Sequence, residues 1–187
     1  MSLNERGFSL PEVLIAMAIS SVLLLGAARF LPALQRNIML NTRQLVLEDE
    51  VWQRIYTVAK HLQRAGYCYG SCIGEALVIS AQGSCVIARW DANSNGVWET
   101  APAKEADTVG FRLQNKVLET LRGAQSCEGK GWDKMTDPDV IQIESFQVAR
   151  QNVSGFAPVL TLQLRAADKA EPQRSIDAVY SVTGYNL

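Results

Sequence analysis

The hydrophobic and polar positions divide the chain into three stretches of different character. Residues 13–28 contain no charged side chain, whereas charged residues occur regularly after them. Beyond Pro32, apolar residues recur at the spacing of one helix face until Gly66, with charged residues between them. The pattern predicts a single helix from about Ser9 to Ala65, roughly 80 Å long at 1.5 Å per residue.

The second half of this predicted helix is amphipathic. The apolar positions assigned to its buried stripe are Ile38, Leu45, Trp52, Ile55, Ala59, Leu62 and Ala65. Pro32 removes an intrahelical hydrogen bond, so we expect the helix to kink or loosen there. The first half has no polar face at all. We therefore expect a membrane-anchored stem whose second half packs on a folded head.

After Gly66 the sequence changes to short β-branched or alternating runs separated by turn residues. These runs are ALVIS, CVIARW, TVGFRL, KVLETL, DVIQIESFQVAR, PVLTLQLRA and SIDAVYSVTGY. Alternation is clearest in VIQIESFQV and VLTLQLRA, which predicts antiparallel strands with one face on a core. A helix followed by a series of strands indicates an α+β fold rather than alternating βαβ units.

Length and charge limit the classes of function. At 187 residues the chain has room for one ordinary domain and an appendage. A net charge of −1 provides no extended field for nucleic acid, so no nucleic-acid partner is expected. The single histidine, His61, provides no basis for a histidine-containing catalytic triad or a multi-histidine metal site. We therefore expect no enzymatic activity.

Four cysteines follow the apolar segment, namely Cys68, Cys72, Cys85 and Cys127. An even number of cysteines downstream of an export-like segment predicts two disulfides formed in an oxidising compartment. Four thiolates can also bind zinc, but the chain has no C-x-x-C pair and its last cysteine is distant. We therefore prefer disulfides, and the sequence leaves all three pairings open.

A carboxylate, Glu12, lies near the start of the apolar segment. A charged side chain at the centre of a membrane helix costs on the order of 3 kcal/mol, and ionisable residues inside such segments usually have a function. Residues 8–31 are long enough for a span of about 20 residues. An ordinary secretory signal or a plain signal anchor explains neither Glu12 nor the sequence Arg6-Gly7-Phe8 before it.

The sequence RGFSLPEVLIAMAIS resembles the class III signal of type IV prepilins and type II secretion pseudopilins. Members of that family have a short leader ending in Gly, a Phe as the first mature residue and a Glu at the fifth mature position. The resemblance implies cleavage by prepilin peptidase between Gly7 and Phe8, and N-methylation of Phe8. It also implies that Glu12, the fifth residue from Phe8, pairs with the terminal amine of a neighbouring subunit.

Other sequences extend the resemblance along most of the chain. They are AKHLQRAGYC, WDANSNG, CEGKGWDK and SVTGYNL, and they are similar to those of minor prepilins related to the PilW and J-type subunits. The resemblance implies a pilin-like fold. In that fold, 1–7 is the leader, 8–31 the transmembrane half of the helix, 32–66 its amphipathic half and 67–187 a β-rich head on an antiparallel sheet.

The function implied by the resemblance is that of a minor pilin that initiates assembly of a type IV pilus or caps it. The implied partners are prepilin peptidase, other minor pilins, the major pilin and the inner membrane. The chain would cross that membrane once, with a cytoplasmic N-terminus and a periplasmic head, and would lie at the pilus tip after assembly. Two alternatives remain, a J-like minor pseudopilin of a type II secretion system and a membrane-tethered calcium-binding adhesin.

The sequence WDANSNGVWET follows the first half of an EF-hand calcium loop. The candidate calcium ligands are Asp91, Asn93, Asn95, the carbonyl of Val97, and Glu99. The twelfth position is Pro102, so the bidentate Glu of such loops is absent. Asn-Gly between two strands is also a strong signal for a hairpin turn. We prefer the turn, with no cofactor, and keep calcium as the alternative.

Overall fold

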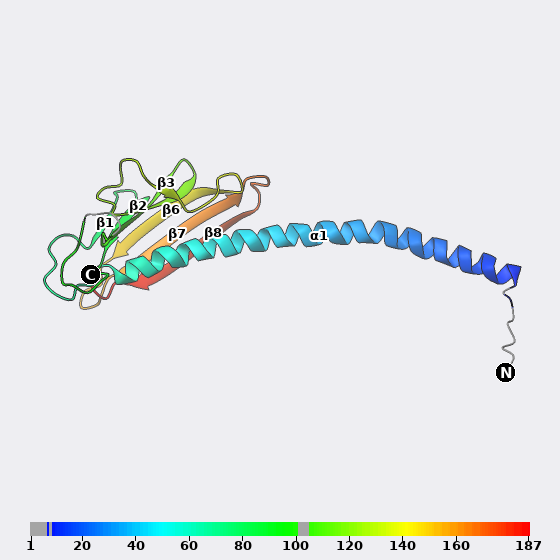
Figure 1. The fold of residues 1–187 in the computed structure, drawn as a ribbon, viewed down its shortest axis with the longest axis horizontal. Coiled ribbons are helices and arrows are strands. Elements are labelled where there is room, and N and C mark those ends of the chain that lie inside the picture. The colour runs from blue at the N-terminus through cyan, green and yellow to red at the C-terminus, as the bar shows by residue number, and fades with distance from the viewer. Residues whose placement is uncertain (1–6, 8, 101–104) are drawn as a thin grey trace, which may run out of the picture. The chain divides into compact units, whose positions relative to one another are not determined.

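A computed structural model describes residues 7, 9–100 and 105–187 (Figure 1). One long helix, α1 (Leu10–Arg64), precedes all of the described strands. The predicted α+β, pilin-like fold is therefore confirmed. The chain divides into two compact units, and the division falls between Leu45 and Val46 within α1.

The first unit consists of the N-terminal part of α1. Every described side chain from Leu10 to Met39 is exposed. The helix continues through Pro32 without a break, so the expected loosening is not seen in its secondary structure. Because this helix surface is exposed, the carbonyl left without a partner by the proline can turn outward.

The second unit begins with the remainder of α1, which packs one face on the head. The buried helix residues are Leu47, Val51, Ile55, Val58, Ala59 and Leu62. The predicted stripe was therefore wrong at its start, because Ile38 is 55% exposed and Leu45 is 64% exposed. Ile38 and Leu45 were assigned because they lie seven residues apart, and seven residues before Trp52. The residues that are in fact buried follow one another mostly in steps of three or four residues, along a different line on the helix surface.

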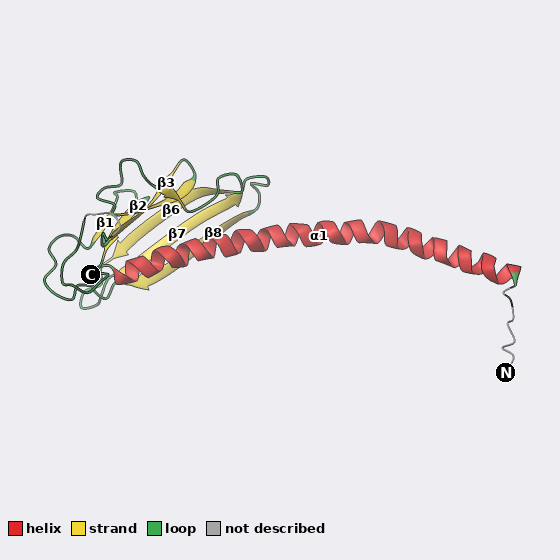
Figure 2. Cartoon of the chain, viewed as in Figure 1, coloured by secondary structure: helices red, strands yellow, loops and turns green. Residues whose placement is uncertain are grey.

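Two antiparallel sheets make up the head (Figure 2). The first contains, in spatial order, β1 (Leu77–Ile79), β2 (Cys85–Arg89), β3 (Thr108–Gln114), β4 (Val117–Arg122) and β5 (Asp133–Lys134). The second contains β6 (Ile141–Gln151), β7 (Val159–Asp168) and β8 (Ser175–Thr183). Each run predicted as a strand overlaps one. The two-residue β5 was not predicted, since it is too short to show a pattern.

Backbone hydrogen bonds connect the two sheets. The N–H of Val148 in β6 donates to the carbonyl of Gly83 at 2.9 Å, and the N–H of Ile143 donates to the carbonyl of Lys116 at 2.9 Å. A bulge between Ile143 and Ser145 shifts the register of β6 against β7. The outer edge of β6 is thus used by the loops of the first sheet, which satisfies part of an otherwise open strand edge.

A single apolar core lies between the helix and the two sheets. Its largest fully buried members include Phe111 of the first sheet, Phe146 and Leu162 of the second, and Leu62 of α1. Burying a side chain of this size contributes about 1.5–3 kcal/mol. The helix is therefore held to the head mainly by this shared core.

Two glycines permit close approaches that no other residue would allow. Gly66, which follows α1, has a φ of +88°, and a Cβ there would lie 2.0 Å from the carbonyl oxygen of Asn186. At Gly110 in β3, a Cβ would lie 2.7 Å from the ring of Trp132. The Trp132 ring in turn packs under the guanidinium of Arg112, 4.3 Å from the ring centre.

Candidate functional site

The segment around the expected cleavage point is exposed where the structure describes it. Gly7 is exposed and outside any regular element, and α1 begins at Leu10. Phe8, the expected first mature residue and methylation site, lies outside the described residues. Pro11 occupies the first turn of α1, where its missing N–H costs little.

Glu12 has a local role that the sequence analysis missed. One of its carboxylate oxygens accepts the backbone N–H of Ser9 at 2.8 Å and the Ser9 hydroxyl at 2.7 Å. A serine followed three residues later by a glutamate is the signature of a capping box, which satisfies donors at the start of a helix. The S-x-x-E sequence could have revealed it. In the isolated chain, Glu12 therefore caps its own helix.

The helix that Glu12 begins is long and apolar enough, by length and composition alone, to cross a membrane. Among the described residues it is the one helix of this kind. Its side chains are exposed through this stretch, so no protein core shelters them. This supports membrane anchoring through the N-terminal part of α1.

All four cysteines form disulfides. Cys68 pairs with Cys72, with Cα atoms 6.0 Å apart, and Cys85 pairs with Cys127, with Cα atoms 6.1 Å apart. No thiolate remains for zinc. The first bridge closes a small exposed loop, and the second joins β2 to the loop between β4 and β5. The sequence could not choose this pairing, because it depends on which segments the sheet brings together.

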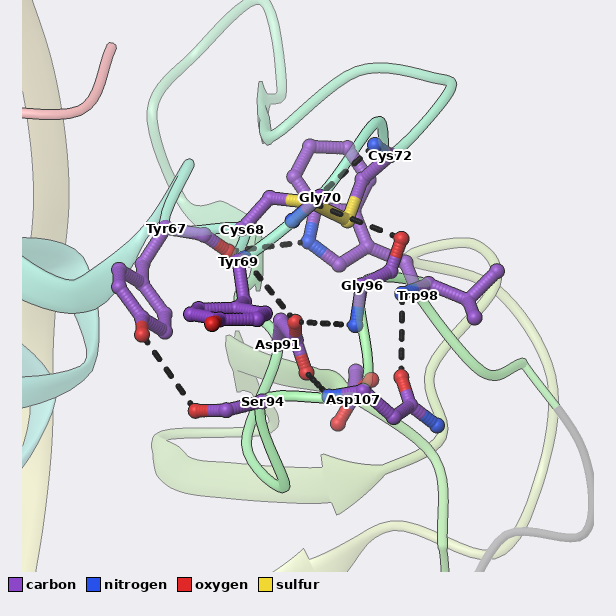
Figure 3. Close-up of a disulfide and its surroundings, with 12 residues drawn as sticks. Tyr67, Cys68, Tyr69, Gly70, Cys72, Asp91, Ser94, Gly96, Trp98 and Asp107 are labelled. Atoms are coloured by element: carbon purple, nitrogen blue, oxygen red, sulfur yellow. Dashed lines mark hydrogen bonds between the residues drawn. A yellow bond between two sulfur atoms is a disulfide. The ribbon is translucent and has the colours of Figure 1, made fainter.

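The candidate calcium loop belongs to the connection between β2 and β3. This connection spans residues 90–107, so the expected tight hairpin turn at Asn95-Gly96 is wrong. Asp91 lies inside this connection and holds part of it in place. Asp91 is 1% exposed, and its carboxylate accepts the N–H groups of Tyr69, Asn95 and Gly96. Figure 3 shows Asp91 beside the Cys68–Cys72 loop.

The other candidate ligands follow Asp91 around the same turn. Asn93 accepts the N–H of Asn95 at 3.1 Å, and Asn95 accepts the N–H of Val97 at 3.0 Å through its side-chain oxygen. The side-chain amide of Asn95 donates to Glu99. Gly96 has a φ of +86°, as the sharp turn of an EF-hand-like loop requires. The structure thus brings the side chains of these candidates into one loop.

Two carboxyl groups meet at the base of this loop. Burial raises the pKa of Asp107, which is 1% exposed, and its hydrogen bond to Glu99 raises that pKa further. The same hydrogen bond is the first cause of a lowered pKa at Glu99. Of the two groups, Asp107 is therefore the one on which protonation is favoured. Asp91 differs, because burial raises its pKa but its backbone N–H donors outweigh this and lower it.

His61 lies where α1 meets the first sheet. Its ring centre is 5.0 Å from that of Trp90 and 5.4 Å from that of Phe111. Burial, followed by the charges of Arg64 and Lys60, lowers the pKa of His61 to about 4. The imidazole is therefore neutral near pH 7, and its contacts with Trp90 and Phe111 are packing contacts.

Comparisons with known proteins agree with these features. Residues 2–28 match the model of the prokaryotic N-terminal methylation motif, and residues 40–184 match the model of prepilin peptidase-dependent protein B. Prepilin peptidase-dependent protein B of Escherichia coli strain K12 is 69% identical over 187 residues, which cover 100% of both chains. No solved structure matches the chain. The chain therefore belongs to the family of prepilin peptidase-dependent protein B and is a minor pilin-like protein.

Proposed function

We propose that this protein is a minor pilin that initiates assembly of a type IV pilus or caps it. The observation that carries the proposal is the N-terminal arrangement, in which Gly7-Phe8 precedes Glu12 and an uncharged helix segment at 13–28. The methylation motif matches the same residues. The role is structural rather than enzymatic.

Processing comes first in this proposal. Prepilin peptidase removes residues 1–7 on the cytoplasmic side and Phe8 is N-methylated. Residues 8–31 then hold the protein in the inner membrane, 32–66 form the amphipathic half of the helix, and 67–187 form the periplasmic head. Mass spectrometry of the membrane-extracted protein should give a chain that begins with methylated Phe8. A chain retaining Met1 would contradict the proposal.

Assembly then depends on Glu12. Cleavage creates a cationic amine at Phe8, and opposite charges attract far more strongly in a low dielectric than in water. We propose that Glu12 exchanges its bonds with Ser9 for the amine of a neighbouring pilin. Other minor pilins and the major pilin are the proposed partners, and they contact this protein through the N-terminal helix.

The capping box allows the charge of Glu12 to be tested apart from its local role. Glu12→Gln keeps a side chain that can accept the Ser9 N–H but removes the charge. Ser9→Ala removes the serine side chain from the cap and keeps the charge. If pairing drives assembly, Glu12→Gln should impair co-purification with other pilins and pilus initiation, whereas Ser9→Ala should have little effect.

The opposite pattern would show that Glu12 serves only as a cap. Cleavage and membrane insertion of both variants should remain normal, which separates assembly from export. Loss of one member of a buried ion pair typically costs about 3–5 kcal/mol, so a strong effect is expected. A J-like pseudopilin of a type II secretion system would behave in the same way, and the neighbouring genes, of a pilus or of a secretion system, distinguish these two roles.

A second proposal concerns the connection between β2 and β3, which we assign as a calcium-binding loop. The proposed ligands are Asp91, Asn93, Asn95, the carbonyl of Val97, and Glu99. The absence of a tight hairpin and the placement of Gly96 at the sharp turn favour this assignment. The twelfth position, Pro102, lies outside the described residues.

Calcium binding to the folded state raises the unfolding temperature by mass action. We expect Ca²⁺ to raise it above its value in EGTA, and Asp91→Asn to abolish the difference. An equal unfolding temperature with and without Ca²⁺ would show that the hydrogen bonds of the loop hold it without an ion. It would also remove the basis for a calcium-dependent adhesin.

A further inference from the structure

The second sheet ends in a long strand edge. β8 is the last strand of this sheet, on the side opposite β6 (Figure 1). Its nine residues pair with β7 without a register shift. Among the residues that the structure describes, no backbone hydrogen bond joins β8 to a segment other than β7. The outer edge of β8 is therefore open.

The backbone bonds at the two ends of β8 show which of its residues point outward. Before β8, the N–H of Asp168 donates to the carbonyl of Arg174 at 3.0 Å. After β8, the N–H of Gly184 donates to the carbonyl of Pro158 at 2.9 Å. Antiparallel bonds alternate along a strand, so the even-numbered residues of β8 bond to β7. The odd-numbered residues direct their N–H and carbonyl groups to the open edge, and they are Ser175, Asp177, Val179, Ser181 and Thr183.

This edge lacks the features that usually keep a strand edge unpaired. Protected edges are short, carry lysine or proline, or contain a bulge. β8 is nine residues long and contains no lysine, arginine or proline. The other sheet edges are better protected, since β1 has three residues, β5 has two, and loops of the first sheet bond to the outer side of β6. The edge of β8 is thus suited to accept a further strand.

An aromatic row borders the open edge on the side of the sheet that faces α1. The ring centre of Tyr180 in β8 is 5.2 Å from that of Tyr56 in α1. The Tyr56 ring centre is in turn 5.7 Å from that of Trp52. Tyr56 is 52% exposed. Apolar side chains of an added strand would lie beside this row, because side chains on one face of neighbouring strands are in contact.

The other side of the sheet carries a row of alternating charges that ends at β8. Glu144 in β6 pairs with Arg165 in β7 at 2.8 Å, and Asp177 in β8 lies directly opposite Arg165. Asp177 is exposed, and its carboxylate accepts the side-chain amide of Gln163 at 3.3 Å. Opposite charges on neighbouring strands stabilise their pairing. A basic residue on the next strand would continue the alternation.

We propose that the outer edge of β8 binds an extended segment of another protein as an added strand. The segment places apolar residues beside Tyr56 and Tyr180 and a basic residue opposite Asp177. The β8 of a second copy does not fit this description, because it has no basic residue to place there. Backbone bonds hold the added strand, and the two rows of side chains select its sequence. The inference does not depend on the proposed role in pilus assembly.

The test uses the full-length protein in detergent and a fluorescently labelled peptide, Thr-Val-Lys-Val-Thr-Val-Lys-Val-Thr. Fluorescence anisotropy should show saturable binding. Val179→Pro should weaken binding about tenfold, because it removes one outward N–H and the bond made by it. Proline is tolerated at such an edge position, since the bonds to β7 remain. Val179→Thr keeps the N–H, so it is the matched control and should bind as the wild type does.

Two changes to the peptide test the inference without altering the protein. Proline in place of the central threonine removes a backbone donor of the added strand and should abolish binding. Glutamate in place of both lysines should weaken binding several-fold, because like charges on neighbouring strands are unfavourable. Equal binding of the lysine and glutamate peptides would contradict the role of Asp177.

Hydrogen exchange, measured residue by residue, identifies the mode of binding. The odd-numbered amides of β8 should exchange quickly in the free protein and be protected by the peptide, whereas the even-numbered amides should be protected throughout. The inference is overturned if no saturable binding occurs, if Val179→Pro binds equally well, or if bound peptide leaves the odd-numbered amides unprotected. Protection of these amides without peptide would show that a second copy occupies the edge, and would also overturn it.

Discussion

The two disulfides should differ in their contribution to stability. Cys85–Cys127 closes a segment of 42 residues, whereas Cys68–Cys72 closes a segment of four. In the chain-entropy model, a crosslink stabilises the fold by restricting the unfolded chain, and the effect grows with the logarithm of the loop length. For these lengths the model gives about 3.9 kcal/mol for the long loop and about 1.9 kcal/mol for the short one.

The perturbation is to replace both cysteines of one bridge with alanine. Changing both avoids a leftover thiol that could pair wrongly, and alanine suits position 85, where the side chain is 5% exposed. The four tryptophans, Trp52, Trp90, Trp98 and Trp132, all belong to the second unit. Their fluorescence therefore follows the unfolding of the head in the full-length protein in detergent.

Urea unfolding then measures the two losses. With a dependence of about 1–3 kcal/mol per M urea, a difference of about 2 kcal/mol separates the two midpoints by roughly 1 M. The variant without Cys85–Cys127 should unfold first. Equal losses, or a larger loss without Cys68–Cys72, would refute the entropic reasoning and show that local packing determines the value of each bridge.

Three further predictions concern the head and can be measured in the same unfolding assay. Leu62→Ala should cost about 2–5 kcal/mol of stability, because the side chain is buried. Leu45→Ala, at an exposed position, should change stability by less than about 0.5 kcal/mol. Equal losses would show that Leu45 is buried after all, as the sequence pattern predicted. Gly110→Ala should cost at least about 1–3 kcal/mol because its Cβ overlaps Trp132, and an unchanged midpoint would contradict the close packing. His61, with a pKa of about 4 when folded and an ordinary value near 6.5 when unfolded, binds more protons in the unfolded chain. Stability should therefore fall as the pH drops from about 6.5 to about 4, by about 1–2 kcal/mol after allowance for partial exposure, and His61→Phe should remove this part of the pH dependence.

The sequence predicted the elements better than their arrangement. The bounds of α1 and the main strands follow from periodicity, since an apolar residue every three to four positions and strict alternation are local signals. The start of the buried helix stripe was misplaced, because Leu45 has the right spacing by sevens but points away from the face that contains Leu47. Whether an apolar residue is covered depends on the sheets, which the helix sequence does not contain.

The candidate sites also separate into features that a local sequence pattern predicts and features that depend on contacts between distant segments. The roles proposed for Gly7, Phe8 and Glu12 rest on a linear motif, so they could be proposed from the order of these residues alone. The pairing of Cys85 with Cys127 could not, because the two residues are brought together only by the β2–β3–β4 arrangement. Similarly, the Asn-Gly sequence predicted a tight turn that does not form. The buried carboxylate of Asp91 accepts the N–H of Tyr69, a residue far away in the sequence, and a local signal does not contain this contact.

The close approach of Gly66 to Asn186 has a consequence for the order of folding. These residues are 120 positions apart in the sequence, yet the backbone of one lies against the backbone of the other. Contacts over such distances form late, because the chain between them must first be ordered. The end of α1 therefore reaches its final contacts only after the residues that follow β8 are in place, and the apolar face around Leu62 stays uncovered until the sheets that pack on it have formed. During that interval the uncovered apolar surface makes the chain prone to aggregation.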